Sequence, residues 1–278
     1  MKEHNYYFIT TYKIDATNYA ACVHGRTITI IDLQTKYTFH NIWAHHRNIN
    51  KFIKYEKDTN HIYIISRSKD KTIKVWCMKD LISKYKGTTY TCKYKVSTNT
   101  EEGAIAMYEI NEQDFLAIVN DQPKSIQLKN LQKHDDIYTL NGHTKEIIAL
   151  KTYQKNQQPY LASAGDDTTI IIWDLTNRTI QSKLSGHMCA ISTIEIIRNT
   201  NNKLYIASGS NDTIKLWDLD TCQAKKTLPV ISHTQRIMSI IIKDNFYLFS
   251  GHSNGEIILW SENNHRENYS PPTQSGCM

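Results

Sequence analysis

The sequence predicts an all-β protein built from one repeated unit of short strands, and two observations lead to this prediction. First, a small residue followed by histidine recurs along the chain, and a tryptophan follows each pair by about thirty residues. Second, the segments between them alternate apolar and polar residues, as half-buried strands do. A repeat of this length made of short strands indicates a β-propeller. The pairs are Ala44-His45, Gly142-His143, Gly186-His187 and Ser232-His233, and the tryptophans are Trp76, Trp173, Trp217 and Trp260.

The positions at which the repeats end give their number. These positions are Ile31, Trp76, Lys129, Trp173, Trp217 and Trp260, spaced 45, 53, 44, 44 and 43 residues apart. The first and third ends lack tryptophan, but residues 27–33 (TITIIDL) and 125–131 (SIQLKNL) keep the alternation of residues 213–219 (TIKLWDL). His4 stands where the histidine of the first repeat is expected. We therefore predict six repeats over residues 4–260, each with four short antiparallel strands bounded by turns such as 165–167 and 253–255.

We expect residues 1–261 to form a single propeller domain and residues 262–278 to form a polar C-terminal tail. The chain starts too late for its N-terminal strand to complete the last repeat, so the outer strand of that repeat has to come from the tail. The tail has a proline pair and little strand pattern, and proline is confined to sheet edges, so this strand should be weak or missing. Either six blades close imperfectly, or a partner strand completes an open edge, as in a seven-bladed arrangement.

Two segments carry a resemblance to a known family. Residues 161–175 (LASAGDDTTIIIWDL) and 206–219 (IASGSNDTIKLWDL) resemble the WD-repeat family. The resemblance implies a buried network in which His, Ser, Asp and Trp of one repeat tie the loops of a blade together. Asn254 replaces the carboxylate in one repeat, which predicts a weaker network there, and Asn211 competes with Asp212 in a shorter turn. The matching sets are His45, Ser66, Asp70, Trp76; His143, Ser163, Asp167, Trp173; His187, Ser208, Asp212, Trp217; and His233, Ser250, Asn254, Trp260.

Physical chemistry alone also explains why His, Ser, Asp and Trp should be hydrogen-bonded together, without reference to the family. A buried tryptophan has to satisfy its indole N–H, and each buried polar group left without a partner costs about 1–3 kcal/mol. Hydrolases also use Ser, His and Asp, but a catalytic triad occurs once, in a cleft, whereas this set recurs. The sequence has no Gly-rich phosphate loop, HExxH motif or metal-spaced Cys/His cluster. We therefore expect no enzyme activity, no cofactor and no metal.

Three features predict the compartment. The six cysteines fall at no common offset, which favours reduced thiols in the cytoplasm or nucleus. The N-terminal residues lack the apolar segment of a secretory signal. No apolar run approaches the roughly 18–20 residues that a membrane helix needs. We expect a soluble cytoplasmic or nuclear protein that does not insert into a membrane.

If the networks are structural, binding falls to the loops that they position. The turn with the aspartate and the loop with the histidine have to lie at the same end of a blade, because the two side chains meet. The exposed residues beside them differ between repeats, as a specific binding surface requires. The candidate residues of this loop face are Asn48, Lys69, Glu146, Asp166, Ala190, Asn211, Arg236 and Ser253.

Basic residues concentrate in one part of the chain. Residues 47–95 hold thirteen Lys and Arg against four Asp and Glu, an excess that is larger than the net charge of +6 of the whole chain. This basic sector fits an acidic protein, RNA or a phosphorylated peptide, or it keeps an exposed surface soluble. The interleaved tyrosines are compatible with base stacking. The candidate basic patch is Arg47, Lys51, Arg67, Lys69 and Lys71, and the tyrosines are Tyr55, Tyr63, Tyr85, Tyr90 and Tyr94.

The sequence thus predicts a non-catalytic scaffold or adaptor that binds one or more proteins of a complex through the loop face, without forming homo-oligomers. Two alternatives stay open. One is a propeller that associates with RNA or ribonucleoprotein through the basic sector, with nucleic acid as its ligand. The other is an open propeller that a partner strand completes in a coat-like or pore-like assembly.

Overall fold

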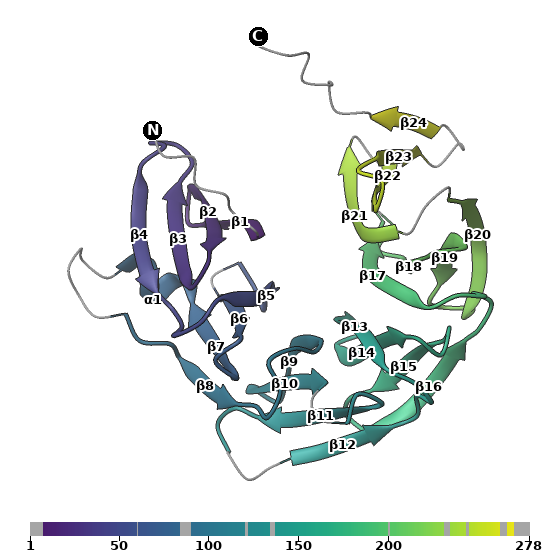
Figure 1. Ribbon diagram of the computed structural model, residues 1–278, viewed down its shortest axis with the longest axis horizontal. Helices are drawn as coiled ribbons and strands as arrows, with labels where there is room; N and C mark the ends of the chain where they lie inside the picture. Colours follow the sequence, from purple (N-terminus) through teal and green to yellow (C-terminus); the bar gives the residue numbers. More distant parts are fainter. Residues whose placement is uncertain are drawn as a thin grey trace. The chain divides into compact units, whose positions relative to one another are not determined.

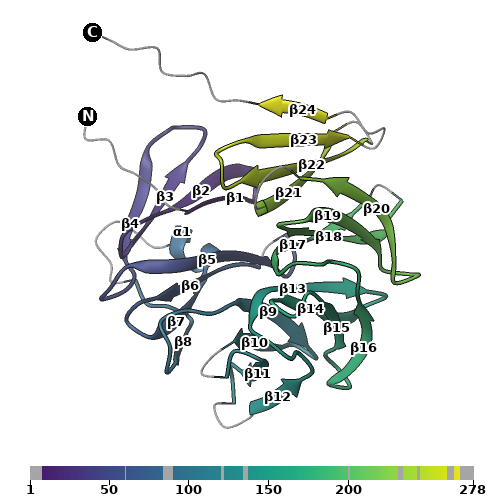
Figure 2. The same ribbon diagram turned by 45° about the vertical axis from the view of Figure 1, so that its right-hand side comes forward.

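The computed structural model describes residues 8–59, 61–83, 90–119, 122–133, 137–199, 201–230, 234–242, 245–261 and 266–269. These residues form six four-stranded sheets, and each sheet consists of four strands that follow one another along the chain (Figure 1). Figure 2 shows the same strands side by side in a second view. The predicted all-β fold of repeated four-stranded antiparallel sheets is therefore confirmed.

The strands have the following bounds. The first three sheets are β1 (Phe8–Ile14), β2 (Thr17–His24), β3 (Thr27–Asp32) and β4 (Thr38–Trp43); β5 (Ile49–Glu56), β6 (Ile62–Ser68), β7 (Thr72–Cys77) and β8 (Tyr94–Ser97); and β9 (Ile105–Ile110), β10 (Gln113–Val119), β11 (Ser125–Asn130) and β12 (Ile137–Asn141). The other three are β13 (Ile147–Lys155), β14 (Gln158–Gly165), β15 (Ile170–Asp174) and β16 (Thr179–Leu184); β17 (Ile191–Arg198), β18 (Leu204–Ser210), β19 (Thr213–Asp218) and β20 (Gln223–Pro229); and β21 (Thr234–Ile242), β22 (Asn245–His252), β23 (Ile257–Ser261) and β24 (Arg266–Tyr269).

The chain forms two compact units. The first unit contains the sheets β1–β4 and β5–β8, and the second contains the sheets β13–β16, β17–β20 and β21–β24. The division between the units runs through the sheet β9–β12. The prediction of one domain over residues 1–261 stays a prediction.

A repeated irregularity shows that the sheets are equivalent. The register between the third and fourth strands shifts at Ile172/Trp173 in one sheet and at Leu216/Trp217 in the next. The first sheet has the same shift at Ile30/Ile31, although it lacks tryptophan there. A β-bulge of this kind strengthens the local twist of a strand. The alignment of Ile31 with the tryptophans, inferred from spacing, therefore corresponds to a real structural equivalence.

The last sheet has an outer strand. β24 pairs with β23 in antiparallel register, from Trp260 opposite Arg266 to Ile257 opposite Tyr269. The outer strand therefore comes from the tail and is present, with a length of four residues. The proline pair that motivated the prediction of a weak or missing strand lies at residues 271–272, beyond the strand and outside the described residues.

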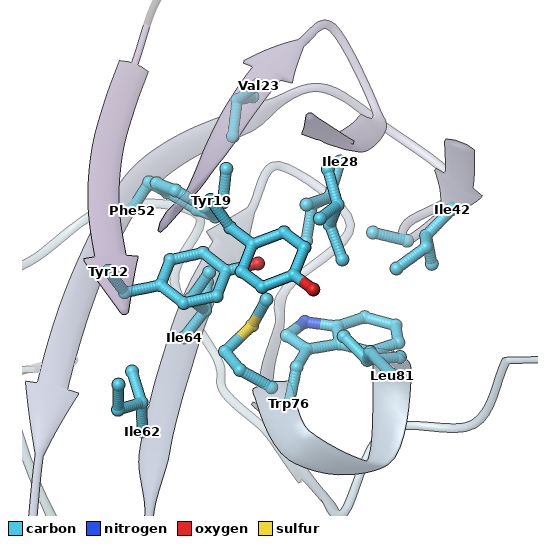
Figure 3. Close-up of a cluster of buried hydrophobic side chains, with 14 of the residues drawn as sticks. Tyr12, Tyr19, Val23, Ile28, Ile42, Phe52, Ile62, Ile64, Trp76 and Leu81 are labelled. Atoms are coloured by element: carbon cyan, nitrogen blue, oxygen red, sulfur yellow. The ribbon is translucent and has the colours of Figure 1, made fainter. Parts of the chain in front are cut away.

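A core cluster of the first unit packs the first and second sheets together (Figure 3). Tyr12 and Tyr19 stack with their ring centroids 5.6 Å apart, and Trp76 is 2% exposed. The short helix α1 (Met78–Ser83) adds Met78 and Leu81, which are spaced three residues apart and so point to the same side. Apolar burial of this kind contributes about 25 cal/mol per Å².

No helix among the described residues is long and apolar enough to cross a bilayer.

Candidate functional site

The best-formed network lies in the sheet β13–β16. His143 enters from the loop between β12 and β13, Ser163 comes from β14, Asp167 from the β14–β15 turn and Trp173 from β15. His143 Nδ1 lies 2.8 Å from Asp167 Oδ2, and His143 Nε2 lies 2.7 Å from Ser163 Oγ. Trp173 Nε1–H donates to the same Ser163 Oγ at 2.7 Å. One buried hydroxyl thus joins the tryptophan to the histidine, and the histidine joins the loop to the turn.

The direction of each hydrogen bond in the network follows from which groups can donate. Because Trp173 N–H uses Ser163 Oγ as acceptor, the serine hydroxyl is free to donate to His143 Nε2, and Nδ1–H then donates to Asp167. This tautomer requires a neutral imidazole. Burial lowers the pKa of His143 and outweighs the opposing effect of Asp167. Burial alone would raise the pKa of Asp167, but hydrogen bonds from the backbone of Thr144 and the side chain of Thr169 lower it instead.

Two further repeats have the same geometry. In the second sheet, His45 Nε2 lies 2.8 Å from Ser66 Oγ, and Nδ1 lies 3.1 Å from Asp70 Oδ2. Burial opposes ionisation of Asp70, but hydrogen bonds from Thr72, the backbone of His46 and His45 lower its pKa to about 2.

In the fifth sheet, His187 lies 2.7 Å from Ser208 Oγ and 3.1 Å from Asp212 Oδ1, and Trp217 donates to Ser208 at 2.8 Å. The carboxylate of the shorter turn is therefore Asp212, and not Asn211.

The serines of these sets are not placed to act as nucleophiles. Ser66, Ser163 and Ser208 are each 0% exposed. Each hydroxyl also accepts an indole N–H, which occupies one of its two lone pairs and ties the oxygen to the core. A nucleophile needs an open approach to the substrate beside its base. The arrangement fits a structural link between two loops.

The sheet β21–β24 departs from the predicted set. Trp260 Nε1–H donates to Ser250 Oγ at 2.8 Å, but the imidazole on this hydroxyl, also at 2.8 Å, is that of His252. Asn254 is exposed, and its side-chain amide donates to Glu256 at 2.9 Å. Asn254 therefore does not take the place of the buried carboxylate, because its turn holds it out in solvent. His233 lies outside the described residues.

The loop-face candidates beside the turn carboxylate and those beyond the histidine lie next to each other at one end of a sheet. Lys69 N–H donates to the carbonyl of Asn48 at 3.0 Å, and Asp166 N–H donates to the carbonyl of Glu146 at 2.9 Å. Asn48, Lys69 and Glu146 are exposed, and Asp166 is half-buried. Asn211 and Ser253 are exposed as well, Ala190 is half-buried, and the backbone of Arg236 lies in β21.

The basic sector does not form one exposed patch. Arg67 is 0% exposed, so it is not part of a surface, and Lys51 is half-buried. Lys57 is paired with Glu109 at 2.7 Å, and Lys93 with Asp114 at 3.1 Å. The exposed basic residues of the predicted patch are Arg47, Lys69 and Lys71.

The tyrosines of this sector are engaged in packing. Tyr63 is 3% exposed and stacks on Tyr55 with the centroids 6.3 Å apart. Tyr94 O–H donates to Asp114 at 3.0 Å, and Tyr90 O–H lies 2.5 Å from His40 Nδ1. Base stacking on these rings is therefore not supported, and Tyr85 lies outside the described residues.

Sequence reasoning missed a second set of network members. A threonine after each carboxylate donates to it: Thr72 to Asp70 at 2.6 Å and Thr169 to Asp167 at 2.8 Å. The signal was present as an Asp-x-Thr pattern in two of the turns. Thr213 directly follows Asp212 and lies 3.2 Å from it.

Among the described residues, no group of three or more His, Cys, Asp or Glu side chains is arranged to hold a metal ion.

The repeated sheets and networks define a class of protein, and the comparisons agree. The family model "WD domain, G-beta repeat" matches residues 134–174 and 178–218. The match gives two WD repeats within residues 134–218, and the findings support the WD-repeat family without indicating a specific member.

Two curated relatives illustrate the similarity. "Coatomer subunit beta'-1" of Arabidopsis thaliana is 28% identical over 71 residues, which cover 26% of this chain and 8% of that protein. "BEACH domain-containing protein A2" of the same plant is 27% identical over 103 residues, which cover 36% of this chain and 2% of that protein. The similarity thus spans only a small part of either relative.

Proposed function

We propose that this protein is a non-catalytic scaffold that binds other proteins through the loop face of its sheets. The observation that carries the proposal is the contrast between fixed and variable positions at one end of the sheets. The buried networks hold the His loop and the Asp turn in the same geometry in three repeats. The residues beside them change from Asn48 and Lys69 in one repeat to Glu146 and Asp166 in another.

Two further findings support the proposal. The WD repeats and the similarity to a coatomer subunit favour a role in protein interaction in general. The recurrence of the Ser–His–Asp set with fully buried serines favours structure over catalysis. The alternative of a partner strand at an open last edge loses its main support, because β24 already pairs along β23.

The test is purification of the tagged full chain with its bound proteins, at low and high salt, with and without nuclease. The key variant is Glu146→Lys with Asp166→Lys, which reverses charge at two adjacent loop-face positions. The matched control is Glu112→Lys, an exposed residue in the β9–β10 turn at the other end of its sheet. We expect a stoichiometric protein set that survives both treatments and the control, and that the loop-face variant reduces.

Two results would contradict the proposal. Loss of every partner on nuclease treatment would indicate nucleic acid as the ligand, since phosphate contacts dominate such binding and weaken steeply with salt. A partner set that no loop-face variant changes would place the interface elsewhere on the protein.

A further inference from the structure

One row of loops at the end of the first two sheets is joined by backbone hydrogen bonds. The turn after β2 accepts from the loop that follows β4: Ala44 N–H donates to Arg26 O at 3.1 Å, and Ile49 N–H donates to Gly25 O at 2.8 Å. That loop accepts in turn from the β6–β7 turn, because Lys69 N–H donates to Asn48 O. All of these residues belong to the first unit. The row is therefore a continuous surface held by main-chain contacts.

An exposed tryptophan stands on this row. Trp43 ends β4 directly before Ala44 and is 62% exposed, whereas the other four tryptophans of the chain are at most 5% exposed. The guanidinium carbon of Arg26 lies 3.9 Å from the centroid of the Trp43 ring. This cation–π contact holds the ring in place while it stays largely accessible. Tryptophan and arginine are the residues most enriched at the energetic centres of protein interfaces.

The surroundings of Trp43 are positively charged. Arg26, Arg47, Lys69 and Lys71 are all exposed on the row. The acidic residue of the same turns, Asp70, is directed inward and accepts hydrogen bonds from His45, Thr72 and the backbone of His46. Glu101 lies 3.8 Å from Arg47.

We propose that this row, which we call the Trp43 surface, binds an acidic segment of a partner protein that inserts a large apolar or aromatic side chain against Trp43. The inference rests on the proposed scaffold function and names the class of partner. The exposed ring supplies an apolar contact, and the four cations around it complement carboxylates. A protein segment fits better than nucleic acid, because Arg67 is buried, Lys57 and Lys93 are paired with carboxylates, and Arg47 has a glutamate 3.8 Å away.

The protein provides its own probe for the test. Because Trp43 is the exposed tryptophan, its fluorescence should respond when a ligand covers the ring. The ligands are a set of short glutamate-rich peptides with phenylalanine or leucine at the centre, which do not overlap with tryptophan fluorescence. Matched peptides carry alanine at the centre or glutamine in place of glutamate, and a single-stranded oligonucleotide is tested beside them. Binding is measured with the full chain by fluorescence and, independently, by calorimetry.

The variants separate the ring from the charges. Trp43→Ala should weaken binding of the aromatic peptides at least about tenfold, as loss of an interface centre does. Lys69→Glu with Arg47→Glu should weaken binding by a similar factor and reduce its dependence on salt. The controls are Tyr37→Ala and Lys36→Glu, which change an exposed aromatic ring and an exposed cation in the β3–β4 turn at the other end of the first sheet. Both controls should bind like the unchanged protein.

Three outcomes would overturn the inference: no peptide of the set binds, binding is the same after Trp43→Ala, or the oligonucleotide binds more tightly than the peptides. These outcomes are distinct from failure of the scaffold proposal. If purified partners persist with Trp43→Ala but are lost with the Glu146 and Asp166 variant, the scaffold function holds and the Trp43 surface is not its interface. Thermal unfolding of each variant shows that it remains folded.

Discussion

Two loops at equivalent places in the molecule are fixed in opposite ways. The loop before β13 is held by a carboxylate: Asp167 accepts from Thr144 N–H and from His143. The loop before β9 is held by a cation: Arg67, from the neighbouring sheet, donates to Thr100 Oγ1 at 2.7 Å and to the carbonyls of Gly103 and Val119 at 3.3 and 3.1 Å. The loop before β13 thus presents N–H groups to the Asp167 carboxylate, whereas the loop before β9 presents oxygen acceptors to the Arg67 guanidinium.

The difference shows what replaces a lost network. The repeat that ends at Lys129 has neither the histidine nor the tryptophan, so it cannot build the Ser–His–Asp link from its own residues. Arg67 fills this need from β6, where other repeats have small residues such as Ala164 and Gly209. Gly103 permits the close approach, because its φ is +133° and a Cβ there would lie 2.3 Å from the carbonyl oxygen of Val119. A loop end can thus be fixed either within its repeat or by the preceding one.

The largest effect should come from removing the cation. Arg67→Met keeps much of the side-chain volume but removes every donor, so the carbonyls of Gly103 and Val119 lose a buried partner. Hydrogen bonds to charged groups contribute about 1.5–3 kcal/mol, and we expect the free energy of unfolding in urea to fall by about 3 kcal/mol. Lys69→Ala changes an exposed residue two positions further along the chain, and it should change the free energy of unfolding by less than about 0.5 kcal/mol.

Hydrogen exchange sharpens this prediction. The amides of residues 98–103 should lose protection in Arg67→Met before those of β13–β16 do, since local openings follow the local contacts. An unfolding free energy within about 0.5 kcal/mol of the unchanged protein would mean that the guanidinium does not anchor the loop.

The next largest effect should come from the carboxylate-centred network. His143→Ala leaves Ser163 and Asp167 without a shared buried partner, and we expect a loss of about 2 kcal/mol in the free energy of unfolding. Thr144→Ala, which keeps its backbone N–H on Asp167, should lose less than about 0.5 kcal/mol. Unchanged stability of His143→Ala together with loss of a turnover activity would refute the structural assignment.

Acid should weaken the three networks together. The pKa values of His45, His143 and His187 are lowered, mainly by burial. The unfolded chain therefore binds more protons than the folded protein once the pH falls below the ordinary histidine pKa of about 6.5, and stability decreases with falling pH. The lowered pKa values of Asp70, Asp167 and Asp212 act in the same direction below an ordinary pKa of 3.8.

Urea unfolding between pH 8 and pH 5 measures the histidine contribution. The free energy of unfolding should fall toward pH 5, and His143→Gln should flatten this slope because one titrating imidazole is gone. Lys69→Ala, which removes no imidazole, should keep it. A slope of the opposite sign would mean that the histidines are charged in the folded protein.

What the sequence predicted depended on side chains that recur. The three complete sets were predictable because His, Ser, Asp and Trp return at nearly fixed offsets, and a recurring polar set inside strands needs a shared reason. Arg67 was not predictable, because its acceptors are mostly backbone carbonyls, which leave no trace in residue type. Its place among many lysines suggested a surface, whereas the structure buries it completely. β24 was predicted only as a weak or missing strand, because residues 266–269 carry no apolar alternation.

The smallest expected changes in stability distinguish the roles of His252 and Asn254 in the last sheet. His252 follows Ser250 by two residues on the same strand, so both side chains point to one face, and the imidazole reaches the hydroxyl that also accepts from Trp260. The sequence predicted His233 as the imidazole of this set and Asn254 in place of the carboxylate. His233 lies outside the described residues, and the β22–β23 turn holds Asn254 in solvent beside Glu256. We therefore expect His252→Ala to lower the free energy of unfolding by about 1 kcal/mol, the value of one buried hydrogen bond. Asn254→Ala should change it by less than about 0.5 kcal/mol. The reverse order in urea unfolding would mean that the exposed turn residue stabilises the sheet more than the imidazole on β22 does.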